Sequence, residues 1–311
     1  MLFLLTWSQI VSKQFNRVVK VEIESNFPTS TGESKIDLSA LRTVFNVKND
    51  ISNFANLGYI EIYNLAESTR NLISEEYQRI KLSVGYGDES GLSVLFDGEI
   101  RNVFHRRVDV DIITELYCAD GDSYNRRSIT KRSSGEDKNL RQIITELISD
   151  LKDTKGKSVS IGEINIEADS VKIKGITFCS TTEESLNNLA ASYNFNWFIE
   201  NRKFYAVSAN RILEKQVTSI ISPQYGMISS PVLTDIGVDV KTLLNPSVRP
   251  GRKIKIQSAG TKVALGALYF ENVSKTLGEG EYKVLRVTHT GDTRGDEWYS
   301  DIETFRDWKS Q

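Results

Sequence analysis

Residues 283–305 read "KVLRVTHTGDTRGDEWYSDIETF" and indicate the fold class of the whole chain. Apolar and polar residues alternate on both sides of a short polar segment, as in two half-buried β-strands. The alternating positions are Lys283, Leu285 and Val287 on the way in, then Trp298, Ser300 and Ile302 on the way out. The segment 291–297 between them, "GDTRGDE", holds two glycines and three acidic residues, which suits an exposed turn. The stretch therefore predicts a long β-hairpin.

Residues of this hairpin also fit two functional motifs, a metal site and an adhesion signal. His289 stands at a strand end with one possible carboxylate near it, but the chain has only one other histidine, His105, and a metal site needs three or four converging ligands. Arg294-Gly295-Asp296 spells an adhesion tripeptide, although turns produce such triplets from composition alone. We therefore expect neither a metal site nor an adhesion signal.

Catalytic patterns are not evident elsewhere in the sequence. No Gly-x-Ser-x-Gly elbow occurs, and the glycines of "GYGDESG" (85–91) lack the lysine and following helix of a phosphate loop. The acidic pairs Asp109/Asp111 and Asp301/Glu303 alternate with apolar neighbours, so we assign them to solvated strand faces. The sequence thus predicts a protein that is not an enzyme, with no catalytic, cofactor-binding or metal-binding residues.

A basic run, "RRSITKR" (126–132), is the best nucleic-acid candidate together with His105-Arg106-Arg107. Tyr117 and Tyr124 lie near these residues in sequence, and oligonucleotide-binding barrels combine such aromatics with basic side chains. The surrounding segment is rich in Asp and Glu, which favours a solvated junction or an ion-pair surface between subunits. Both interpretations stay open at this point.

Composition is that of an ordinary soluble globular protein. The 311 residues suggest two or three domains, and 39 basic against 41 acidic residues give a net charge of −2. This balance argues against a dedicated duplex-DNA binder. The two cysteines, Cys118 and Cys179, are too few for a disulfide framework, and we interpret both as buried thiols.

The N-terminus, "MLFLLTWSQIV", has no basic leading region and no small-residue cleavage site, and it is too short to cross a bilayer. We expect a protein that is neither exported nor membrane-spanning. The apolar arm from Leu2 to Trp7 is predicted to be buried in an interface.

The first third of the chain is predicted to be β. Strands are indicated by "RVVKVEIES", by "GYIEIYN" with Ile60 and Ile62 on one face, by "RIKLSVGYG", and by two long strands in 97–120. A short helix is expected near 67–78. Several strands with one short helix suggest a closed or nearly closed barrel.

The middle of the chain changes character. An amphipathic stripe predicts a helix near 137–152 with Asp137 as its N-cap. A second helix near 181–193 begins with a capping box of Thr181 and Glu184. A hairpin over 195–208 follows, and β patterning returns after a link rich in Ser, Pro and Gly. The predicted architecture is α+β, mostly β: a tube-like barrel in 1–124, a central α+β domain in 125–222 and a second tube-like barrel in 223–311.

Several segments in order resemble the baseplate hub proteins of contractile-tailed bacteriophages. The similarity lies in "GMISSPVLTDIGVDVKTLLNPSVRPGRKIKIQS" (226–258) and in "GEYKVLRVTHTGDTRGDEWYSDIET" (280–304). Upstream, "GYIEIYNLAESTRNLI" (58–73), "VGYG" (84–87) and "LFDGEI" (95–100) are similar to the first barrel of that family. The resemblance covers both ends of the chain, whereas 125–222 matches mainly through its order of helices and hairpin.

The resemblance implies a structural hub of the virion's tail baseplate, assembled in the host bacterial cytoplasm. Three copies, each with two barrels, would form a homotrimeric ring that matches a sixfold tail tube or tube initiator on one side and a threefold central spike on the other. The tape measure and then DNA would pass through its channel, and neighbouring baseplate proteins would contact it. No cofactor and no stable membrane association are implied. Two alternatives stay open: a tail-associated cell-wall hydrolase, and a barrel protein that binds single-stranded nucleic acid.

Overall fold

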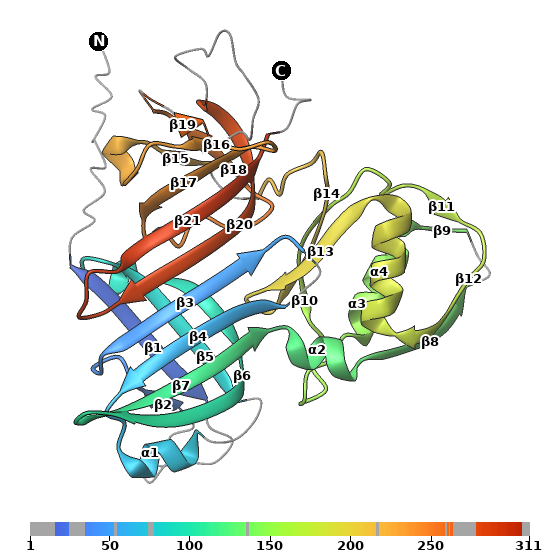
Figure 1. Cartoon of the computed structure of the whole chain (residues 1–311). Helices are drawn as coiled ribbons and strands as arrows, with labels where there is room; N and C mark the ends of the chain where they lie inside the picture. Colours follow the sequence, from blue (N-terminus) through green and yellow to red (C-terminus); the bar gives the residue numbers. More distant parts are fainter. Residues whose placement is uncertain are drawn as a thin grey trace, which may run out of the picture.

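The computed structural model describes residues 16–24, 35–52, 55–73, 78–134, 137–215, 218–258, 260, 262–263 and 278–306. The predicted N-terminal arm, Leu2 to Trp7, lies outside these residues. The predicted fold class is confirmed, because the described chain is mostly β and its longest helices lie in the middle (Figure 1). None of the described helices combines the length and apolar character needed to cross a membrane.

The first unit, residues 17–120, contains the strands of the predicted first barrel. Its elements are β1 (Arg17–Glu24), β2 (Lys35–Asp37), β3 (Thr43–Asp50), β4 (Asn56–Tyr63), α1 (Glu67–Leu72), β5 (Arg79–Tyr86), β6 (Ser93–Val108) and β7 (Asp111–Asp120). Ile60 and Ile62 share the buried face of β4, as predicted. The helix predicted near 67–78 is present as α1, and residues 74–77 lie outside the described part of the chain.

The last unit, residues 219–305, contains the hairpin predicted over 283–305. Its strands are β15 (Ser219–Ile221), β16 (Val232–Leu233), β17 (Val238–Leu243), β18 (Lys253–Ile256), β19 (Lys262–Val263), β20 (Gly280–Asp292) and β21 (Trp298–Phe305). The predicted hairpin is confirmed as β20 and β21. A bulge at Leu285 shifts the register, so Tyr282 and Val284 are buried before it and Val287 and His289 after it. The uninterrupted alternation predicted through this strand is therefore wrong.

The first and last units repeat one pattern of strand pairing. In the first unit β3 pairs with β4, β4 with β7, β7 with β6, and β6 with β5. In the last unit β16 pairs with β17, β17 with β21, β21 with β20, and β20 with β18. All these pairs are antiparallel. The strands therefore correspond in chain order: β3 to β16, β4 to β17, β5 to β18, β6 to β20 and β7 to β21.

Among the described strands, one antiparallel pairing joins the two units. β20 lies against β3, from Arg286 opposite Asp50 to Asp292 opposite Val44. The result is a 14-stranded sheet, and its strand path in the described residues is open, running from β19 to β2. Figure 1 shows the red strands β20 and β21 continuing the blue sheet of β3 and β4. The two predicted barrel units thus share a sheet.

The central unit, residues 121–208, stands beside this sheet (Figure 1). Its elements are α2 (Asp122–Arg127), β8 (Ile129–Ser134), β9 (Lys138–Asn139), α3 (Leu140–Asp150), β10 (Ser160–Asn165), β11 (Lys172–Ile173), β12 (Ile176–Thr181), α4 (Thr182–Tyr193), β13 (Phe195–Glu200) and β14 (Lys203–Ser208). The helices and hairpin enclose a separate apolar core that includes Ile144, Leu147, Leu186 and Trp197. Both predicted helices and the predicted hairpin are confirmed.

Two local predictions about this unit are wrong. The N-cap of α3 is Asn139 rather than Asp137, and Asn139 forms a full capping box with Gln142. The reason is that Lys138 and Asn139 pair with β11, which holds them extended and delays the start of the helix. Cys179 is exposed, because its strand β12 pairs only with β8 among the described strands; Cys118 is buried, as predicted.

Candidate functional site

The turn between β13 and β14 is the point at which the central unit meets the first unit. Its two residues, Asn201 and Arg202, have φ angles of 49° and 61°, in the left-handed region that a two-residue hairpin turn requires. Neither residue is glycine, so the conformation needs support from its surroundings. The carboxylate of Asp120 gives that support, because it accepts hydrogen bonds from the backbone N–H groups of Asn201 and, at 3.3 Å, of Arg202.

Asp120 is the last residue of β7 and is buried. Burial raises its pKa well above the usual range, and the nearby charge of Asp97 acts in the same direction. The two turn N–H groups oppose this shift only in part. The carboxyl group of Asp120, at the end of the first unit, therefore stabilises the β13–β14 turn of the central unit.

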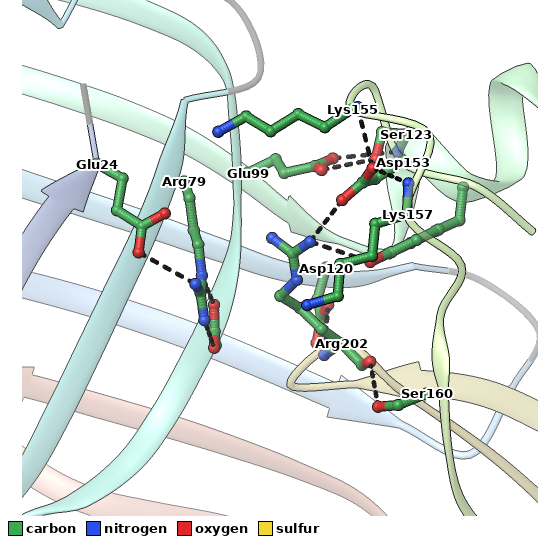
Figure 2. A network of polar contacts seen from close by, with 12 residues as sticks. Glu24, Arg79, Glu99, Asp120, Ser123, Asp153, Lys155, Lys157, Ser160 and Arg202 are labelled. Atoms are coloured by element: carbon green, nitrogen blue, oxygen red, sulfur yellow. Dashed lines mark hydrogen bonds and ion pairs between the residues drawn. The ribbon is translucent and has the colours of Figure 1, made fainter. Parts of the chain in front are cut away.

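The side chain of Arg202 extends this contact into the helical part of the central unit (Figure 2). Its guanidinium group donates to Tyr124 Oη at 3.1 Å and to Asp153 Oδ2 at 2.8 Å. The other carboxylate oxygen of Asp153 accepts from the backbone N–H groups of Lys155 at 2.9 Å and Lys157 at 2.8 Å. One turn residue thus fixes both α2 and the loop after α3.

Glu99 and Arg79 complete this network from the side of the first unit (Figure 2). Glu99 on β6 accepts from the backbone N–H of Ser123 at 3.1 Å and from its hydroxyl at 2.6 Å, at the first turn of α2. Burial raises the pKa of Glu99. Arg79 binds Asp97 at 2.6 and 2.7 Å and Glu24 at 3.1 Å, which ties β5 to β6 and β1. The start of the central unit is therefore anchored by polar bonds.

The last unit reaches the same hairpin through a buried ion cluster. Glu200, which precedes the turn, pairs with Arg249 at 3.1 Å and Arg252 at 2.9 Å. Arg249 also donates to the carbonyl oxygen of Val94 in the first unit. Burial alone would raise the pKa of Glu200, but the two guanidinium groups outweigh it and hold this pKa below its usual value. Because burying unpaired charge is costly, the three side chains depend on one another.

Two further buried contacts join the units. Asn56 on β4 donates its side-chain amide to the carbonyl oxygen of Ile199 at 2.9 Å. Lys283 on β20 donates its ammonium group to the carbonyl oxygens of Ser208 at 2.8 Å and Ala209 at 3.2 Å. The β13–β14 hairpin is therefore a three-way junction. Its role is structural, since its charged groups form ion pairs with one another.

The two histidines of the chain occupy corresponding positions. His289 Nδ1 lies 2.8 Å from Ser300 Oγ across β20 and β21, and His105 Nδ1 lies 3.1 Å from Thr114 Oγ1 across β6 and β7. His289 is fully buried, whereas His105 is exposed. Burial, and next the charge of Arg249, lowers the pKa of His289 to about 3, so this imidazole is neutral at physiological pH.

Metal binding by these histidines has no support in the described residues, where no group of three His, Cys, Asp or Glu side chains is placed to hold a metal ion. The tripeptide of Arg294, Gly295 and Asp296 lies in the loop between β20 and β21, as predicted, and the neighbouring carboxylate of Asp292 accepts from the Arg294 N–H at 2.8 Å.

The basic run 126–132 is divided between α2 and β8. Arg126 pairs with Asp122 at 3.1 Å, and Arg132 pairs with Asp150 at 2.6 Å. The separate basic residue Arg106 binds Glu61 at 2.9 Å and also Glu115. These ion pairs lie within the chain, so the predicted ion-pair surface between subunits stays a prediction.

A recess of about 630 Å³ lies beside α2. Within it Arg101 contacts Asp122 at 3.1 Å, and Arg286 contacts Asp50 at 2.6 Å. Its principal cations thus have protein partners.

The geometry can be compared with known proteins. The sequence model of the family described as baseplate hub gp41 matches residues 18–261. Two solved structures are each 9% identical to this chain, with a TM-score of 0.60 over 94% of it and 97% of the other chain: the 43 kDa tail protein of prophage MuSo2 from Shewanella oneidensis, and a tail protein from Neisseria meningitidis MC58. No curated protein matches the sequence.

A third structure extends the comparison. The E. coli c3393 protein, a type VI secretion system component with structural similarity to T4 bacteriophage tail proteins gp27 and gp5, is 9% identical, with a TM-score of 0.53 over 85% of this chain and 73% of that one. At such identities the likeness concerns the fold alone.

Proposed function

We propose a specific role for this chain, which belongs to the baseplate hub gp41 family and is a structural component of a phage tail. Its finer role, on this proposal, is that of a trimeric adaptor between the sixfold tail tube and the threefold central spike. Assembly would take place in the host bacterial cytoplasm, and the finished protein would sit in the tail baseplate.

The observation that carries this proposal is the repeated strand pattern of the first and last units. Each chain holds two copies of one β arrangement, with β3, β4, β6 and β7 corresponding to β16, β17, β20 and β21. Three such chains present six similar β units, and they do so with threefold symmetry. An assembly of this kind can match six equivalent subunits on one face and three on the other, which a ring with one unit per chain cannot do.

The division into domains 1–124, 125–222 and 223–311 is part of the proposal. It is supported by the separate apolar core of the central unit and by the core of the last unit around Val240, Ile254 and Val284. The core of the first unit also receives Leu244 and Trp298 from the last unit, so these two domains would act as one rigid body.

A structural role for the junction fits the same proposal. Glu200, Arg249 and Arg252 fix the central unit to both β units, which would keep the pair of β units in one geometry during assembly. The tape measure and DNA would then move through a channel lined by the polar face of the sheet. The protein would carry no catalytic activity, and no described feature favours a cell-wall hydrolase or a single-strand-binding protein.

The test is assembly with the proposed partners. Mass photometry of the purified chain, alone and mixed with the spike protein of the same phage, is expected to show a trimer or a spike-dependent trimer. Electron microscopy of the particle should place the chain on the tail axis with threefold symmetry. A chain that stays monomeric with both spike and tube proteins would overturn the adaptor role. Peptidoglycan dye release by the pure chain would overturn the non-enzymatic role.

A further inference from the structure

The strand β6 has a bare edge where its counterpart β20 is covered. β20 pairs with β21 on one side and with β3 on the other, from Arg286 to Asp292. β6 pairs with β7 as far as Val108, but its pairing with β5 stops at Glu99. In the described part of the chain, no strand pairs with the second edge of residues 102–108. Such an edge presents unpaired backbone groups that can bind another strand.

The correspondence between β6 and β20 holds residue by residue. Both strands carry a register shift, at Arg101 in β6 and at Leu285 in β20. Counting from these bulges places His105 at the position of His289, and Thr114 at the position of its partner Ser300. The equal histidine–hydroxyl contacts, at 3.1 and 2.8 Å, agree with this alignment. The pairing of β20 with β3 therefore shows how a strand can pair with the bare edge of β6.

We propose that residues 102–108 of β6 bind the β16 strand of a second copy of this chain, antiparallel, in the arrangement in which β20 binds β3. We choose β16 as the partner strand because it corresponds to β3. It forms an antiparallel hairpin with β17, as β3 does with β4. This inference rests on the proposed ring and names the edges through which its chains associate. Because the two edges differ, the contact is head to tail, and rotation closes it into a ring.

The register of the contact follows from the pairing of β20 with β3. Inside the chain Thr290 lies opposite Asn46, and their side chains are hydrogen-bonded at 3.0 Å. The corresponding residues are Arg106 in β6 and Val232 in β16, so Arg106 lies opposite Val232 of the second copy. His105 then lies opposite Leu233 of the second copy, as His289 lies opposite Val47.

Exposed apolar side chains on both edges support a protein partner. On β6, Phe104 is 55% exposed and Val108 is 42% exposed. Beside the partner strand, Ile236 is 55% exposed in the turn that follows β16. The proposed register brings this turn beside Phe104. In the single chain the outer edge of β16 carries β19 over two residue pairs, and the incoming β6 replaces that short pairing.

Cysteine cross-linking tests the register. In a Cys179→Ser background, which removes the exposed native thiol, Arg106→Cys and Val232→Cys are combined and the protein is assembled with its spike protein. Oxidation or a short bismaleimide is expected to give covalent dimers and trimers at least ten times more abundant than with either single variant. Folding should survive, because the Arg106 side chain is 44% exposed and Glu61 keeps the hydrogen bond that Tyr59 donates to it.

A matched control moves the first thiol off the edge. Val110 is 86% exposed at the tip of the β6–β7 hairpin, so Val110→Cys with Val232→Cys should cross-link no better than the single variants. If trimers form by mass photometry and the Arg106/Val232 pair does not cross-link, this edge assignment is wrong and the trimer stands. If no oligomer forms with spike or tube, the proposed function itself fails.

Discussion

The covered strand β20 and the bare strand β6 show how much of a residue's environment comes from a neighbouring strand. His289 and His105 each contact a hydroxyl group across the same hairpin position, yet one is fully buried and the other is exposed. The surroundings differ: β3 pairs with β20 and Arg249 lies near His289, whereas no described strand pairs with the second edge of the matching stretch of β6. Local sequence sets the contact within the hairpin, whereas the surroundings of the hairpin set how deeply each imidazole is buried. Burial lowers the pKa of both histidines, and His289 is the more deeply buried of the two.

The largest effect is expected when the junction beside the covered strand is broken. Glu200→Ala leaves Arg249 and Arg252 buried without their carboxylate, so the free energy of unfolding should fall by about 3–5 kcal/mol. Urea unfolding followed by tryptophan fluorescence measures this loss. Glu303→Ala is the control, because the Glu303 side chain is 49% exposed in its pair with Arg286, and it should cost less than about 1 kcal/mol. Equal losses in both variants would contradict the buried clamp.

The next effect separates the two histidines directly. His289→Ala should lower the free energy of unfolding by about 2–4 kcal/mol, since it leaves a buried cavity and removes one of the two hydrogen bonds of Ser300 Oγ, the other coming from the Asn245 N–H. His105→Ala should change the same quantity by less than about 0.5 kcal/mol, because this position is exposed. Denaturant midpoints of the two variants in the isolated chain give the comparison. A large loss at His105 would show that the β6 edge is already covered.

The smallest effect, counted per pH unit, is a pH slope carried by the covered histidine. In the unfolded chain His289 takes up a proton near its ordinary pKa of 6.5, but in the folded chain it does so only near pH 3. Between these values the unfolded state binds more protons, so acid favours unfolding. The free energy of unfolding should fall by at most about 1.4 kcal/mol per pH unit in this window. His289→Gln should reduce the slope, and a slope equal to that of the native chain would contradict a neutral buried imidazole.

Much of the fold followed from local patterns. The N-cap at Thr181 accepts from the Glu184 backbone N–H, and the apolar stripe of α3 is buried, because capping and helical periodicity act within a few residues. The wrong N-cap prediction at Asp137 is also local, because the true cap, Asn139, lies two residues away. Asp137 and Asn139 are both capable caps, and only the pairing of β9 with β11 decides between them.

Local sequence patterns could not predict the candidate site at the β13–β14 hairpin. Glu200 meets Arg249 and Arg252 across about fifty positions of sequence, and no periodicity links them. The bulge at Leu285 and the burial of His289 depend on strands that the sequence places far away. The exposed Cys179 is a different kind of error, because a β-prone neighbourhood indicated burial, although among the described residues β12 pairs with β8 alone.

The pairing of β3 with β20 can form only late in translation, because the two strands lie far apart in the chain. β3 ends at Asp50 and β20 begins at Gly280, so a ribosome working at about 5–20 residues per second needs roughly ten to fifty seconds between them. Throughout that interval the edge of β3 has no partner strand from its own last unit. Until the final hairpin emerges, this edge of β3 is open to pairing with strands of other nascent chains.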